Sequence, residues 1–218
     1  MSDIRDSRKY VIRKMADGNC WMSSNLKYEL YANTTRTGVN NTTGEPITFS
    51  TGNACSNNAA CIMNGNTAYD STYDSWYYNW YAATAGSGTE SMATDDGDAT
   101  NSICPAHWRL PTNYTNTSYP SGGADKSWGH LLNDYGISPN NHDSDTEYQI
   151  LDTFPFNLQR AGYFLSGAFQ NNGYGYWWST TAHSTATSAY RLRFSTTDVG
   201  PQVYVNKYFG FNVRCVSI

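Results

Sequence analysis

The chain has 218 residues, enough for one sizeable core in one large domain or two small ones. Charged residues make up only 15% of it, aromatic residues another 15%, and the formal net charge is -4. This balance gives no basic footprint, so we expect no nucleic-acid partner. Abundant Tyr, Asn, Thr, Ser and Gly are typical of a loop-rich extracellular module rather than of a cytosolic enzyme.

Neither a membrane span nor an export signal is visible in the sequence. No apolar run is long enough to cross a bilayer, and the first five residues are largely polar. A cytosolic protein would begin in this way, and so would an exported protein whose signal or anchor had been removed. The composition favours the second interpretation. We therefore expect an extracellular or cell-surface location, with membrane contact only through a missing N-terminal anchor.

The first half of the chain predicts short elements separated by long loops. Residues 9–15 alternate as a first strand does, and residues 20–26 predict a short helix or an ordered turn. Residues 31–73 predict a long inserted loop with local order or a role in binding. The dense aromatic block at 76–83 predicts a short buried helix.

The second half passes from helices to strands. Residues 86–100 predict a flexible acidic loop, and residues 104–112 a rigid element bounded by two prolines. Helical spacing of apolar residues predicts a helix over 125–135, and the segment 147–158 is expected to hold a second helix that ends before Pro155. From residue 162 onward the pattern is that of β-structure.

Two kinds of position alternate in the last quarter. A frame of Gly, aromatic and apolar residues recurs at Gly162, Gly167, Gly173, Trp178, Ser179, Tyr190, Leu192, Phe194, Gly210, Phe211, Val213, Arg214 and Cys215. The residues between them resemble a paratope, because Tyr, Ser, Asn and occasional Arg are what adaptable binding surfaces use. The candidate ligand-binding residues are Tyr163, Phe164, Ser166, Phe169, Asn171, Asn172, Tyr174, His183, Ser184, Arg191, Arg193, Val203, Tyr204, Val205, Asn206, Tyr208 and Phe209.

Alternation assigns these positions to faces of strands. Tyr190, Leu192 and Phe194 share one face, and Arg191 and Arg193 share the other. The same period predicts one shared face in the last strand for Phe209, Phe211, Val213 and Cys215.

Five cysteines allow two disulfides and one free thiol. Cys55 and Cys61 bracket a short polar loop that they can close, and Cys104 and Cys215 can tie the middle of the chain to its end. Cys20 would then stay buried and free. Five reduced thiols are the alternative. The sequence contains no CxxC pair, so it does not indicate a zinc site.

No residue pattern indicates catalysis. The four histidines are widely separated and no HExxH pair occurs, so we assign no catalytic residue, no metal site and no cofactor. Asp95, Asp96 and Asp98 lie around Gly97 as calcium ligands can. Regular spacing and a following Glu are missing, which favours a solvated acidic loop.

Five segments in chain order carry a family resemblance. They are DIRDSRKY at 3–10, GNCWMSSNL at 18–26, CPAHWRLPT at 104–112, WST at 178–180 and GFNVRC at 210–215. This series resembles the Fibrobacter major paralogous domain family, with His107 in place of the usual Gly. Segments 31–73 and 86–100 fall outside the resemblance.

The resemblance implies an α+β architecture, specifically a C-type lectin-like fold with twisted antiparallel sheets, two helices and long ordered loops. It implies one domain over residues 1–218, with insertions near 31–73 and 86–100, and an exported or surface-attached bacterial protein. The pairing of Cys104 with Cys215 belongs to the same pattern.

Members of this family include variable proteins of diversity-generating retroelements, in which adenines of a template are randomised. An Asn codon changed at its two adenines cannot give Trp, Met, Lys, Gln or Glu. The candidate residues obey this limit. The residues that do not obey it, and that therefore belong to the frame, are Gln170, Trp177, Trp178, Gln202 and Lys207.

The leading hypothesis is thus a binding protein that is not an enzyme, with a diversified surface for a protein or cell-surface ligand. The alternative is a carbohydrate-binding or adhesive domain of fixed sequence, although the usual calcium–sugar tripeptides are absent. A formylglycine-generating-type enzyme ranks third. A structural cell-wall module without a ligand also remains open.

Overall fold

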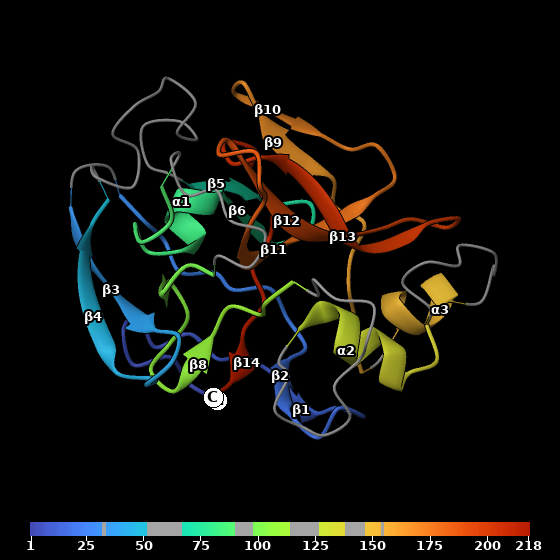
Figure 1. Cartoon of the computed structure of the whole chain (residues 1–218), viewed down its shortest axis with the longest axis horizontal. Helices are drawn as coiled ribbons and strands as arrows, with labels where there is room; N and C mark the ends of the chain where they lie inside the picture. Colours follow the sequence, from blue (N-terminus) through green and yellow to red (C-terminus); the bar gives the residue numbers. More distant parts are fainter. Residues whose placement is uncertain (32–33, 52–66, 90–97, 114–126, 138–146, 154) are drawn as a thin grey trace.

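A computed structural model describes residues 1–31, 34–51, 67–89, 98–113, 127–137, 147–153 and 155–218. Within these ranges the chain folds into small antiparallel sheets with three short helices, which is an α+β architecture (Figure 1). No helix in the described ranges is both long enough and apolar enough to cross a membrane.

One sheet joins the two ends of the sequence. Its strands are β1 (Ile12–Lys14), β2 (Cys20–Met22), β14 (Val216–Ser217) and β8 (Trp108–Arg109), in that order. The first strand confirms the prediction over 9–15. The helix or turn predicted from residue 20 is wrong, because residues 20–22 pair as a strand between β1 and β14.

The segment predicted as a long inserted loop contains strands. β3 (Thr35–Asn40) pairs with β4 (Pro46–Ser50) and with β7 (Asn101–Ser102), which confirms local order there. β5 (Thr67–Asp70) pairs with β6 (Ser75–Tyr78). The predicted helix over 76–83 is therefore limited to α1 (Trp80–Ala83), because the earlier aromatic residues pair with β5.

Two helices follow where helical spacing predicted them, with shorter bounds. α2 (Trp128–Asp134) begins after Ser127, whose hydroxyl accepts a hydrogen bond from the His130 backbone N–H at 3.0 Å. α3 (Glu147–Asp152) ends before the predicted limit.

The last quarter is β-structure, as predicted. β9 (Tyr163–Leu165) and β10 (Ala168–Gln170) form a hairpin whose two-residue turn has positive φ at both Ser166 and Gly167, the geometry that suits the twist of paired strands. A second antiparallel sheet has the order β11 (Gly175–Ala182), β12 (Ser188–Phe194), β13 (Val199–Asn206).

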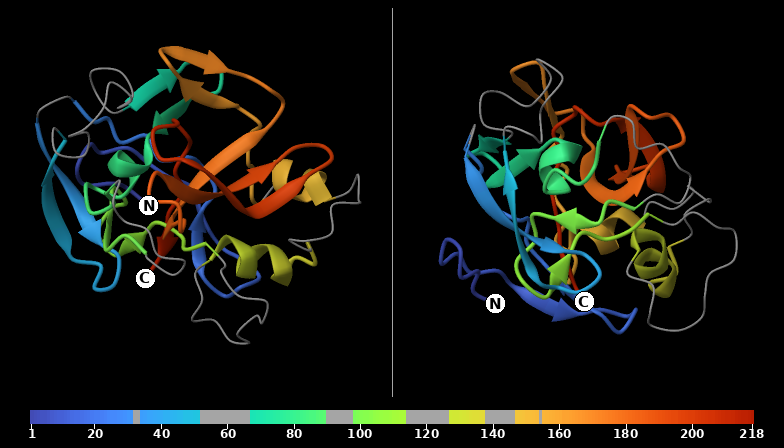
Figure 2. Two further views of the ribbon diagram at one scale, coloured as in Figure 1. Left: turned by 45° about the horizontal axis from the view of Figure 1, so that its top comes forward. Right: turned by 60° about the vertical axis from the view of Figure 1, so that its left-hand side comes forward.

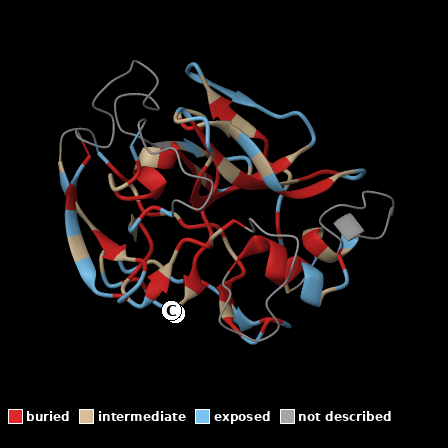
Figure 3. Ribbon diagram, in the orientation of Figure 1, coloured by how far each residue is buried: buried red, intermediate tan, exposed pale blue. Residues whose placement is uncertain are grey.

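This second sheet has an apolar cluster on each face, and Figure 3 colours much of its ribbon as buried. Trp177, Leu192 and Phe194 belong to one apolar cluster, together with α2 and α3 residues. Trp178 belongs to the other, which also contains Phe211. The exposed residues of the sheet, Gln202 and Tyr204, both lie on its edge strand β13, whereas β11 is buried throughout.

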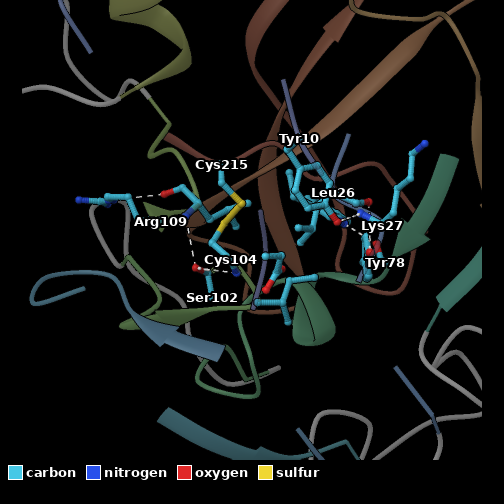
Figure 4. The surroundings of a disulfide bond; sticks show 12 residues. Tyr10, Leu26, Lys27, Tyr78, Ser102, Cys104, Arg109 and Cys215 are labelled. Carbon is cyan, nitrogen blue, oxygen red and sulfur yellow. Dashed lines mark hydrogen bonds between the residues drawn. A yellow bond between two sulfur atoms is a disulfide. The ribbon is translucent and has the colours of Figure 1, made fainter. Parts of the chain in front are cut away.

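The disulfide joins Cys104 to Cys215, with a Cα–Cα distance of 5.9 Å between fully buried residues (Figure 4). The hydroxyl of Ser102 beside it accepts hydrogen bonds from the backbone N–H groups of Cys104 and Leu110. Cys20 is free, and it is half-buried rather than buried as expected. The predicted Cys55–Cys61 pair lies outside the described residues, as do Asp95 and Asp96 of the acidic loop.

Residues 209–215 do not form the single alternating strand that was predicted. Phe211, Val213 and Cys215 are buried, but Asn212 and Arg214 between them are buried too. The segment runs through the core, where Asn212 donates a hydrogen bond to the Trp76 carbonyl at 2.9 Å. Because the segment has neighbours on both sides, none of the residues 211–215 faces solvent and the expected alternation of buried and exposed residues is absent.

Candidate binding surface

The candidate residues separate from the frame by burial. All of them except Phe164 and Arg191 are exposed or half-buried. Most frame residues are buried; the exceptions are two turn glycines and the half-buried Tyr190. Among the residues that the codon limit placed in the frame, Trp177, Trp178 and Lys207 are fully buried, whereas Gln170 and Gln202 are exposed.

Phe164 corrects the expected list. It is 4% exposed and packs with Tyr77 and Ala161, so its side chain does not face solvent. The cause is a pair of backbone hydrogen bonds with Gly210, which turn β9 against the segment at 208–211. Phe169, on the next strand, keeps 42% exposure while contacting both Phe164 and Tyr77.

Six side chains form what we call the arginine–aromatic surface: Tyr163, Tyr174, Tyr176, Arg191, Arg193 and Phe209. They come from β9, from the end of β12, from the start of β11 and its preceding turn, and from the turn after β13. The cross-strand pairs Tyr176–Arg193 and Trp178–Arg191 place the two arginines on one face of the sheet.

Ring contacts bind this surface together. The Tyr163 ring lies 5.4 Å from that of Phe209 and 5.8 Å from that of Tyr176. Tyr174 stacks on Tyr176 at 6.0 Å. Arg193 lies 5.5 Å from the centre of the Tyr174 ring, within the range of a cation–π contact. Tyr and Phe give large contact areas with little side-chain entropy to lose, which suits a recognition surface.

Arg191 also differs from expectation, because it is 9% exposed. Its guanidinium lies 4.6 Å from the centre of the Tyr176 ring and 4.8 Å from that of Phe211. Burial lowers the pKa of Arg191 to about 10. The side chain therefore stays charged at neutral pH while most of it is desolvated.

A second group lies on the opposite face of the same sheet. His183 stacks on Tyr204 at 3.8 Å, and Tyr190 contacts both rings. Tyr204 is 54% exposed. Because neighbouring residues of a strand point to opposite faces, this group and Arg191 cannot meet one flat partner surface together. The sequence did not separate these two groups.

The hairpin and the turn after it supply the remaining contacts. Asn171 donates a hydrogen bond to the Tyr73 hydroxyl at 2.5 Å, and Asn172 donates one to the Tyr176 hydroxyl at 2.7 Å. The Asn172 amide thus fixes a ring of the arginine–aromatic surface. In all views of Figures 1 and 2 the hairpin projects from the end of the molecule opposite the sheet of β1, β2, β14 and β8.

Sequence reasoning missed two features. Tyr176 was not a candidate, and it is buried, yet its ring contacts the Arg191 guanidinium and its register with Arg193 places it on the same face. The second feature is a hollow of about 360 Å³ in another part of the molecule. Its lining includes Lys27, Tyr69, Asp74 and Trp76, none of which was a candidate.

These observations define a class: an α+β, antiparallel-sheet domain with a buried frame, a buried disulfide and a partly exposed aromatic surface. The chain belongs to the Fibrobacter succinogenes major domain family, whose model matches residues 15–217. A search of curated proteins found no match. A search of solved structures also found none.

Proposed function

We propose that the protein is a ligand-binding display protein of the cell surface or extracellular space. In this proposal a C-type lectin-like frame carries a C-terminal segment diversified by a retroelement, and the diversified side chains bind a protein or cell-surface target. The exported location rests on the composition and on the buried disulfide, because disulfides persist in oxidising compartments.

The observation that carries the proposal is the match between two independent divisions of the last quarter. Residue types in the sequence divide this segment into frame residues and candidate binding residues. Burial in the structure divides it in nearly the same way. Trp177, Trp178 and Lys207, which adenine randomisation of an Asn codon cannot produce, lie in the core. A rigid frame with exposed aromatic residues lowers the entropy cost of binding.

Site-specific photo-crosslinking tests the proposal. A photoreactive phenylalanine replaces Phe209 in one variant and the exposed Tyr31, far along the chain, in another. The purified variants are irradiated with intact cells from the protein's own microbial community. We expect a recurrent adduct at position 209 and none at position 31. Adducts at neither position, or at both equally, would contradict the proposal.

A fixed-sequence carbohydrate-binding domain is the second candidate, and the hollow near β5 and β6 favours it. The Tyr69 and Trp76 rings lie 5.2 Å apart there, and Asp74 accepts a hydrogen bond from the Tyr69 hydroxyl at 3.0 Å. Aromatic walls with a few polar groups suit a sugar ring. A glycan array with strong hits that Trp76→Ala abolishes would support this candidate over the first.

A further inference from the structure

Arg191 is a buried cation that has no hydrogen-bond or ion-pair partner among the described residues. Within the described part of the chain, no residue accepts a hydrogen bond from its guanidinium and no carboxylate pairs with it; its Nε is buried and unpaired. The contacts of the guanidinium are the rings of Tyr176 and Phe211. Buried donors are almost always paired in native proteins, so this exception calls for an explanation.

Arg214 shows how the same fold buries an arginine for structural purposes. Its guanidinium donates to the Asn25 side-chain oxygen at 3.0 Å, to the Asn157 carbonyl at 2.7 Å and to the Phe156 carbonyl. All of its nitrogens thus have acceptors inside the protein. Among the described residues Arg191 has no such acceptors, and it belongs to the arginine–aromatic surface, so we take its donors to be available to a group from outside.

The local charge balance leaves one positive charge uncompensated. Arg193, two residues along β12 and on the same face, forms an ion pair with Asp198. Arg191 has no such partner, and the nearby Arg193 charge disfavours its protonated form. One monoanion placed beside Arg191 would neutralise the group. A doubly charged phosphate would leave an excess of negative charge.

The planar shape of the guanidinium also favours a monoanion, and in particular a carboxylate. A guanidinium binds a planar carboxylate through two parallel hydrogen bonds. The Tyr163 and Phe209 rings, 5.4 Å apart, belong to the same surface, and apolar surroundings strengthen a charge pair. We propose that Arg191 is the central anchor of the surface and receives a carboxylate group of the protein target, with Arg193 as a second donor. This inference rests on the proposed function and names the chemistry of its ligand.

NMR spectroscopy of the arginine Nε–Hε groups of the full chain tests this assignment. The probe is N-acetyl-phenylalaninate, which combines a carboxylate with an aromatic ring, and its amide is the uncharged match. We expect the acid to give a saturable shift of the Arg191 signal, and the amide to bind at least tenfold more weakly. The shift should disappear as the pH falls through the carboxyl pKa of the probe, roughly 3.5.

Variants assign the signal and control for general charge effects. Arg191→Gln should abolish saturable binding, and Arg191→Lys should weaken it severalfold, because an ammonium cannot form the paired hydrogen bonds. Arg13→Gln removes an exposed arginine of β1 and should change nothing. The indole signal of Trp177, which donates to Asn25 in the core, reports whether each variant is folded.

Three results would overturn the inference. They are unchanged binding by folded Arg191→Gln, equal shifts at Arg13 and Arg191, and saturation by inorganic phosphate without saturation by the acid probe. The inference and the proposed function fail separately. If crosslinking at position 209 identifies a target that Arg191→Gln binds as tightly, only the inference fails. If the probe binds Arg191 and no target is crosslinked, only the proposed function fails.

Discussion

Two buried arginines of this protein show how partners decide the energetic role of a side chain. Arg214 is fully enclosed and burial lowers its pKa to about 9, yet carbonyl oxygens accept its hydrogen bonds. Arg191 is almost as buried and has no acceptor among the residues that the structure describes. Burying a charge without a partner is costly, so Arg191 lowers the stability of the free protein and Arg214 is part of what holds it together.

Substitution of these two arginines by methionine should therefore have opposite effects. Arg191→Met keeps the packing against Tyr176 and removes the unpaired charge, so we expect the free energy of unfolding to rise by about 1 kcal/mol. Arg214→Met leaves buried carbonyl groups without donors, so we expect a loss of about 3 kcal/mol or more. Urea unfolding followed by tryptophan fluorescence measures both. A destabilised Arg191→Met would show that Arg191 is a structural residue.

At the scale of single residues the sequence predicted the frame better than the surface. Alternation correctly separated Leu192 and Phe194 from the two arginines, because a strand has a strict period of two. The expected exposure was wrong for Phe164 and for Arg191, which are covered by residues of other segments. Burial by a remote segment leaves no local signal, so no single-sequence pattern reveals it.

His107 is a further residue-scale departure. It occupies the position where the family resemblance expects Gly, and its backbone φ is 65°, in the left-handed region that favours Gly. The backbone N–H of His107 donates to the Gly44 carbonyl at 2.9 Å. The turn thus keeps the backbone geometry of a glycine. Because His107 has a Cβ, this left-handed conformation costs about 1 kcal/mol of stability.

At the scale of elements, Gly162 fixes how the hairpin joins the sheet. A Cβ at Gly162 would lie 2.0 Å from the Gln170 carbonyl oxygen, and its φ is 72°. Its backbone N–H donates to the Tyr174 carbonyl at 2.8 Å. Gly173, in the neighbouring turn, has a similar φ of 78° but open space around its Cβ position. A comparison of alanine substitutions at Gly162 and Gly173 therefore distinguishes the effect of backbone strain from the effect of steric contact.

We expect Gly173→Ala to lower the free energy of unfolding by about 1 kcal/mol, the cost of a left-handed conformation for a residue with a Cβ. Gly162→Ala should cost at least about 1–3 kcal/mol beyond that, because the contact with Gln170 forces the backbone apart. Urea unfolding of the two variants gives the comparison. Equal losses would contradict the close approach at Gly162.

The disulfide makes the other element-scale contribution, since it links β8 and β14 regions 111 residues apart in sequence. In the chain-entropy account, a cross-link that closes such a long loop stabilises the folded protein by roughly 4–5 kcal/mol, because it restricts the unfolded chain. We expect Cys104→Ala with Cys215→Ala to lose most of that amount in urea unfolding, and Cys20→Ala to change stability little. An unchanged double variant would mean that the buried core alone holds these strands.

Helix and strand predictions succeeded where the pattern was long and failed where it was short. α2 follows from apolar residues at helical spacing over two turns, and Ser127 caps its start. The aromatic run from Trp76 has no period that distinguishes a helix from a strand. It became a strand because β5 pairs with it, and β5 arises from a segment whose polar composition indicated a loop.

At the scale of the whole molecule, the sheet of β1, β2, β14 and β8 and the sheet of β11, β12 and β13 have different roles. The sheet of β1, β2, β14 and β8 lies near the C-terminus, and the β9–β10 hairpin projects at the other end (Figure 2). The sheet of β11, β12 and β13, which carries three residues of the arginine–aromatic surface, is buried on both faces at Trp177 and Trp178. Changes at the surface residues are therefore buffered from the sheet near the C-terminus by a packed layer.

The central claim is that this surface is diversified while the frame stays constant, and the genomic locus tests it most directly. Sequencing downstream of the gene should reveal a near-copy of the segment that encodes residues 162–215, together with a reverse transcriptase gene. We predict that the two copies differ only at adenines of the near-copy, in codons for exposed or half-buried positions such as Tyr204 and Phe209, with Trp177, Leu192 and Lys207 unchanged. The absence of any copy, or differences scattered equally over the buried frame, would contradict the account.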